Sequence, residues 1–213
     1  MSKHTRTRRS VLAGLGAVAA AGAAGTVAAP VAEAQSNTAP FAPALFEPDA
    51  WMSAMRGSKQ RVILDVESPE RMPDLVRFVG NIFAAHKSGY GVDEGDIAII
   101  VCFRHAATPF GYTDAIWSKY GKTIDAKNAP VTNIYNSGER MQLSDIAKRG
   151  VQFIVCATAS RGLATRIAGQ GGDVEAVMKE FGANLIPSAR LVPAGIVGVI
   201  HAQNRGFALI HVG

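Results

Sequence analysis

The chain has 213 residues, 48% of them hydrophobic, and its 22 lysines and arginines against 17 acidic residues give a net charge of +5. Residues 1–34 hold four basic residues and one acidic residue, so the remaining 179 residues carry +2 and fit a single domain. Their basic residues are scattered and aromatic residues are few, which excludes the usual kind of nucleic-acid-binding surface. Two cysteines are too few for a disulfide-built fold, so a hydrophobic core must supply the stability.

The N-terminus has the pattern of a twin-arginine export signal. Arg8 and Arg9 precede an apolar stretch rich in alanine and glycine at residues 11–29, and residues 32–34 match a small-x-small cleavage site. The alternative is an uncleaved membrane anchor, because the stretch approaches the roughly 20 residues that span a bilayer. Alanine and glycine insert poorly, which favours cleavage near Gln35. We therefore expect a periplasmic or secreted mature protein with no stable membrane span.

Residues 35–60 are predicted to form a linker or N-terminal extension. They mix alanine, proline, serine and asparagine with the isolated apolar residues Phe41, Phe46 and Trp51. We expect these three side chains to anchor the extension on a domain that covers residues 61–213.

Apolar runs alternate with amphipathic segments throughout this domain. Strands are predicted at residues 62–66, 97–103, 151–156, 189–192 and 207–210. Helices are predicted from Ser68-Pro69 to about Gly89, over residues 113–120, 143–149 and 174–181, and from Pro193 to Gly206. The last helix is expected to bury Ile196, Val197, Val199 and Ile200. Alternating strands and helices imply an α/β domain with a parallel sheet and right-handed crossovers.

Cys156 is the main candidate for chemistry. Ligands of an open parallel sheet bind beyond the carboxyl ends of its strands, and Cys156 closes the third predicted strand. A helix should begin directly after it, and the N–H groups and dipole of that helix favour a thiolate. Such a sulfur can act as a nucleophile or carry a persulfide, although a cysteine in an apolar strand can equally be a small core residue. Cys102 lies inside its own strand and is expected to pack in the core.

Other polar residues near the strand ends are weaker candidates. Arg104 and His105 follow the second strand, and His105 could move a proton near Cys156 if their loops meet, or could simply be a surface histidine. His201 and His211 are interpreted as structural. No spacing resembles a zinc or iron site, and the glycine-rich residues 169–172 are interpreted as a turn, so no metal or cofactor is expected.

Three motifs in the C-terminal half resemble the DsrE/DsrF-like family of sulfur-relay proteins. They are Phe153-Ile154-Val155-Cys156, the pair Arg161-Gly162, and Leu191-Val192-Pro193-Ala194-Gly195 leading to Gln203-Asn204-Arg205-Gly206-Phe207-Ala208. The resemblance covers roughly residues 60–213 and implies a three-layer α/β/α fold with a five-stranded, mainly parallel sheet. It also implies a homo-trimer or homo-hexamer, with Cys156 at the position that carries sulfur as a persulfide. The relay proteins of this family act in the cytoplasm, whereas this chain is predicted to be exported.

Two functions follow from these observations. The first is an exported sulfur carrier or sulfurtransferase-like protein, in which Cys156 holds sulfane sulfur and Arg104, His105 or Arg161 stabilises the anionic sulfur or its donor. Its partner would be a sulfur-donor or acceptor protein, or a small sulfur compound. The alternative is a non-catalytic module for small-ligand binding or assembly, with Cys156 buried. A third idea, dithiol chemistry between Cys102 and Cys156, requires their Cα atoms to lie within about 7 Å.

Overall fold

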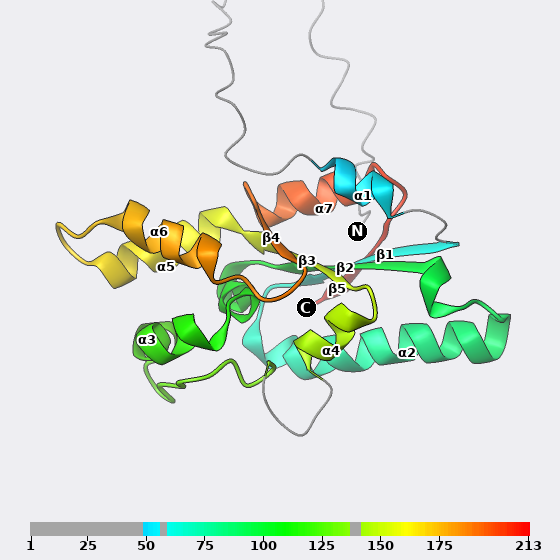
Figure 1. The fold of residues 1–213 in the computed structure, drawn as a ribbon, viewed down its shortest axis with the longest axis horizontal. Helices are drawn as coiled ribbons and strands as arrows, with labels where there is room; N and C mark the ends of the chain where they lie inside the picture. Colours follow the sequence, from blue (N-terminus) through cyan, green and yellow to red (C-terminus); the bar gives the residue numbers. More distant parts are fainter. Residues whose placement is uncertain (1–48, 56–58, 137–141) are drawn as a thin grey trace, which may run out of the picture. The chain divides into compact units, whose positions relative to one another are not determined.

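Five parallel strands form the centre of the fold, which is taken from a computed structural model that describes residues 49–55, 59–136 and 142–213 (Figure 1). The strands stand in the order β4-β3-β2-β1-β5. They are β1 (Gln60–Val66), β2 (Ile97–Phe103), β3 (Gln152–Cys156), β4 (Ala189–Val192) and β5 (Ala208–Val212). Each pairs in parallel with its neighbours, as the apolar runs predict. The predicted export signal and most of the predicted extension lie outside the described residues.

Helices connect these strands. The α-helices are α1 (Ala50–Ala54), α2 (Met72–Tyr90), α3 (Asp114–Ile124), α4 (Leu143–Lys148), α5 (Ala157–Ala168), α6 (Val174–Ala183) and α7 (Gly195–Gln203). Short 3-10 segments are η1 (Pro69–Arg71), η2 (Glu94–Asp96) and η3 (His105–Gly111). Within the described residues no helix is long and apolar enough to cross a membrane.

The strand order places the helices on two faces. From β1 to β4 the chain moves in one direction across the sheet, so right-handed crossovers bring α2 to α6 to the same side. The connection from β4 to β5 runs back past β1, which brings α7 to the opposite side. Figure 1 shows α7 and α1 above the sheet and α2 and α4 below it. The result is the predicted three-layer α/β/α arrangement.

Each face of the sheet has its own core. The larger core lies under α2 to α6 and contains the stacked rings of Phe103 and Phe153, whose centroids are 5.7 Å apart. The smaller core lies under α7 and α1, where Ile100 and Ile154 of the sheet contact Val199 and Met52 of the helices. All seven residues of β2 are buried because this strand is covered on both faces.

Helix α1 ties part of the predicted extension to the domain. Met52 is fully buried in the smaller core, and the ring of Trp51 lies 4.4 Å from the guanidinium carbon of Arg190. Asp49 accepts a hydrogen bond from His201 of α7. Trp51 therefore contacts the domain as expected, within a short helix that the sequence did not predict.

Two helix predictions need correction. Helix α2 ends at Tyr90, one residue beyond Gly89, and its cap is Gly91, which has a left-handed φ of 63° and donates its N–H to the carbonyls of His86 and Lys87. In α7, Ile196 and Ile200 are 53% and 48% exposed instead of buried. The face of α7 that meets the sheet consists mainly of small residues, namely Gly195, Gly198, Val199 and Ala202.

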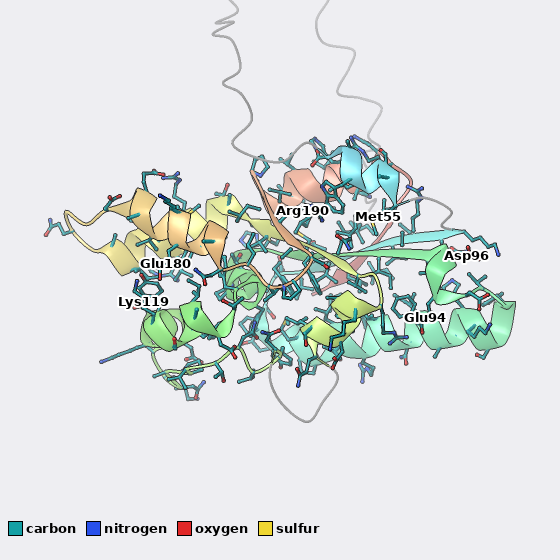
Figure 2. The ribbon with its side chains drawn as sticks, viewed as in Figure 1. Met55, Glu94, Asp96, Lys119, Glu180 and Arg190 are labelled. Atoms are coloured by element: carbon teal, nitrogen blue, oxygen red, sulfur yellow. The ribbon has the colours of Figure 1, made fainter. Side chains whose placement is uncertain are left out.

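Pairs of charged side chains also join helices that are distant in sequence. Lys119 of α3 and Glu180 of α6 form a salt bridge of 2.8 Å, and both are labelled at one end of the molecule in Figure 2. Tyr120 donates a second hydrogen bond to the same carboxylate, at 2.6 Å. These contacts hold α6 against α3.

Candidate functional site

The sheet has one switch point, between the carboxyl ends of β3 and β4. The chain leaves β3 toward α5 on one face and leaves β4 toward α7 on the other, so the two connections diverge at this edge. Divergence of neighbouring connections opens a crevice where open α/β sheets bind ligands. Cys156 stands there, paired in register with Val192, the last residue of β4.

Cys156 is also the N-cap residue of α5. Its Sγ accepts a hydrogen bond from the backbone N–H of Ala159, with a nitrogen–sulfur distance of 3.4 Å. The helix begins directly after the strand, so the sulfur lies at the positive end of the helix dipole. This contact stabilises negative charge on the sulfur.

Access to this sulfur is narrow. Cys156 is 7% exposed, and Thr158 links the start of α5 to Pro193, directly after β4. Both the backbone N–H and the hydroxyl of Thr158 donate to the carbonyl of Pro193, at 3.2 and 3.0 Å. The sulfur therefore lies at the strand end where the sequence places it, but only a small part of the residue reaches solvent.

Gly195 brings the first turn of α7 against both cysteines. A Cβ on this glycine would lie 2.8 Å from Cβ of Arg104, 3.1 Å from Sγ of Cys102 and 3.3 Å from Cβ of Cys156. Only a residue without a side chain fits there. The start of α7 thus packs its backbone directly against the ends of β2 and β3.

Cys102 has the core position that the sequence predicts. It is fully buried, and its Sγ lies 3.6 Å from the carbonyl oxygen of Gly195, to which the thiol donates. Burial raises the pKa of this thiol far above its ordinary value, and the nearby charges of Asp65 and Cys156 raise it further. Cys102 is therefore a neutral thiol.

The two cysteines are both free and lie on the same face of the sheet. Cys102 pairs with Ile154, two residues before Cys156. With strands about 4.8 Å apart and a rise of about 3.3 Å per residue, their Cα atoms lie roughly 8 Å apart, beyond the ~7 Å that a disulfide bridges. A disulfide between them would require the backbone to move.

Arg104 is engaged by two carboxylates. Its guanidinium makes a two-pronged contact with buried Asp65, at 2.7 and 2.8 Å, and a third contact with Glu67 at 2.8 Å. The hydrogen bonds that Arg104 donates to Asp65 are the main reason that the pKa of Arg104 is raised. His211 of β5 lies 3.4 Å from Asp65 on the other side. This cluster joins β1, β2 and β5, and its positive charge is already balanced.

The other two predicted anion-binding residues lie elsewhere. Arg161 is on the exposed side of α5, where it forms a salt bridge of 2.6 Å with Glu175 of α6. His105 is exposed, has a left-handed φ of 49°, and lines a cavity that Cys156 does not line. The structure therefore does not gather Arg104, His105 and Arg161 around the sulfur. The hydrogen-bond donor to the sulfur is instead the backbone N–H of Ala159, at the start of the helix that the sequence predicts directly after Cys156.

No group of three or more histidine, cysteine or acidic side chains with metal-binding geometry occurs among residues 49–55, 59–136 and 142–213.

No protein-family model matches the chain, and no curated protein matches it. Among solved structures it is similar to the protein of unknown function MTH1491 from Methanobacterium thermoautotrophicum. The two chains are 18% identical, with a TM-score of 0.43, and the match covers 71% of this chain and 98% of that one. Membership in the DsrE/DsrF-like family thus stays a prediction from the sequence motifs.

Proposed function

We propose that this protein is an exported DsrE-like sulfur carrier that holds sulfane sulfur on Cys156. The observation that supports this most is the position of the sulfur, at the switch point of the sheet and at the N-terminus of α5, where Ala159 donates an N–H to it. Cys102, by contrast, is a neutral and fully buried thiol. The two cysteines therefore have different roles.

The loading step is a sulfur transfer without net oxidation. With thiosulfate as donor, the Cys156 thiolate attacks the outer sulfur, a new sulfur–sulfur bond forms at Sγ, and the bond within thiosulfate breaks. Sulfite leaves with the electron pair, and the protein keeps a persulfide anion. A later acceptor thiolate reverses the roles and takes the outer sulfur.

The chain's own groups determine which donors suit this step. The N–H of Ala159 stabilises the sulfur anion, and the 7% exposure of Cys156 favours a small donor such as thiosulfate or polysulfide over a bulky one. Arg104 and Arg161 are paired with carboxylates, so either could assist an anionic donor only by leaving those partners. Backbone groups carry the stabilisation in this proposal.

The export signal and the homo-oligomer belong to the same proposal. A twin-arginine signal fits a domain that folds before export, and its core needs no disulfide. Self-assembly as a trimer or hexamer is supported by the exposed apolar residues Ile196 and Ile200 of α7.

The test is intact-mass measurement of the reduced full chain after incubation with thiosulfate or polysulfide. We expect an adduct of about 32 Da that dithiothreitol removes, because a persulfide is reducible. Cys156→Ala should form no adduct, and the matched variant Cys102→Ala should form it as the wild type does. Absence of the adduct with every donor, or its persistence in Cys156→Ala, would refute the proposal.

A further inference from the structure

A large cavity lies on the other side of Ala159 from Cys156, which itself does not line it. Its volume is about 1060 Å³, which suits a small organic molecule. It is bounded by η1, η3, α3, the segment of residues 124–135 and one side of α5. Nothing in the proposed sulfur chemistry uses this space.

The deep part of the cavity has an aromatic and apolar wall. Phe110, Trp117 and Leu163 line it and are 6%, 4% and 2% exposed. The rings of Phe110 and Trp117 have centroids 5.3 Å apart, and the Trp117 indole N–H already donates to Pro109. This wall offers aromatic surface to a ligand, and its indole N–H is already used.

One buried polar atom on the wall lacks a partner. Thr108 lines the cavity and is 1% exposed, and its hydroxyl oxygen has no hydrogen-bond partner in the structure. Buried hydroxyls are nearly always satisfied, so an orphaned one beside a cavity indicates a missing bonding partner. A polar atom of a ligand would supply it once the hydroxyl, which is buried in the structure, turns toward the cavity.

The cavity is lined by two cations, Lys127 and Arg166, and by two carboxylates, Glu70 and Asp125, so its formal charge is balanced. Within the part of the chain that the structure describes, the side chains of Lys127 and Arg166 form no hydrogen bond or salt bridge. The carboxylates nearby are already engaged. Asp125 accepts from Asn128 and from the backbone N–H of Lys127, and Glu70 accepts from Ser68 and its own backbone N–H. The side-chain donors of Lys127 and Arg166 are thus unused, whereas the oxygens of the two carboxylates already accept hydrogen bonds.

We propose that this cavity binds a flat aromatic molecule that carries one carboxylate. Its ring lies against Phe110 and Trp117, a polar atom pairs with the Thr108 hydroxyl, and the carboxylate faces Arg166 and Lys127. His105 lines the same cavity as a further donor. The site is independent of the sulfur chemistry, so the two proposals stand or fall separately.

Isothermal titration calorimetry of the full chain with 2-naphthoate tests the proposal. We expect one saturable site with a dissociation constant on the order of 0.1–1 mM, as for a ligand of this size. Arg166→Gln should weaken binding about fivefold and Thr108→Val about threefold. The neutral amide, 2-naphthamide, should bind wild type about as weakly as 2-naphthoate binds Arg166→Gln.

Two matched variants separate this site from the rest of the molecule. Arg161→Gln removes a cation from the same helix outside the cavity, and Cys156→Ala removes the sulfur, and both should bind 2-naphthoate as the wild type does. Absence of saturable binding overturns the proposal. So does binding that neither Arg166→Gln nor Thr108→Val weakens, because the ligand would then occupy another place.

Discussion

Gly195 shows how a single residue shapes the surroundings of both cysteines. Because it has no side chain, the first turn of α7 reaches the ends of β2 and β3 and its carbonyl accepts from the Cys102 thiol. The sequence marks Cys156 as the end of an apolar strand before a helix. It does not show that a glycine nearly 40 residues later lies against the same residue.

Gly195→Ala is expected to lower the free energy of unfolding by about 1–3 kcal/mol, because the added methyl group overpacks a buried contact. Its Cβ would meet Cβ of Arg104 at 2.8 Å, and neither backbone can move freely. Gly182→Ala is the control, since its nearest neighbour is a Leu191 methyl at 3.8 Å. Urea unfolding should find the control neutral or stabilised. Equal stability of Gly195→Ala and wild type would show that α7 does not approach the cysteines this closely.

At the scale of elements, α7 is the instructive case. Its sequence is apolar nearly all round, so hydrophobic periodicity cannot identify the buried face. Close approach to the sheet selects the small side chains, since a Cβ at Gly198 would lie 2.6 Å from Ile154. Ile196 and Ile200 are consequently turned outward.

This orientation predicts a large effect on stability at one position of α7 and a small effect at the next. Val199→Ala should cost about 2 kcal/mol of unfolding free energy, because it removes buried methyl groups and leaves a cavity. Ile200→Gln should change the stability of the monomer by less than about 0.5 kcal/mol. Urea denaturation measures the unfolding free energy of each variant, and light scattering measures the molar mass of its assembly. A large loss of unfolding free energy in Ile200→Gln, with the molar mass in solution unchanged, would contradict the outward orientation. A lower molar mass for this variant would support assembly through α7.

At the scale of the whole molecule, charged contacts join elements that the sheet does not connect directly. Glu180 links α6 to Lys119 and Tyr120 of α3, and Glu94 of η2 links to Arg149 at the end of α4. The hydrogen bonds from these partners lower the pKa of both glutamates below the ordinary 4.5. A carboxylate with a lowered pKa stabilises the folded state only while it is ionised.

The Glu180 contact should therefore weaken in acid. The unfolded chain takes up the proton first, so the contribution is complete above about pH 5 and decreases as the pH falls through 4.5 and below. Glu180→Gln should be less stable than wild type at about pH 7, and the gap should narrow at about pH 3. Urea midpoints at both pH values measure this, with Lys119→Gln as the reciprocal variant. A gap that is unchanged in acid would mean that the contact is not electrostatic.

The sequence by itself determined the five strands, the parallel α/β class and the place of Cys156 at a strand end. These features follow from local patterns, namely apolar runs, helix starts at proline and turns at glycine. The tertiary structure alone decided which face of α7 is buried, and it also paired Arg104 and Arg161 with carboxylates. The cavity beside Thr108 and Trp117 is likewise visible only in the tertiary structure. The salt bridges and the cavity both involve residues distant in sequence, which the crossovers of the sheet bring together.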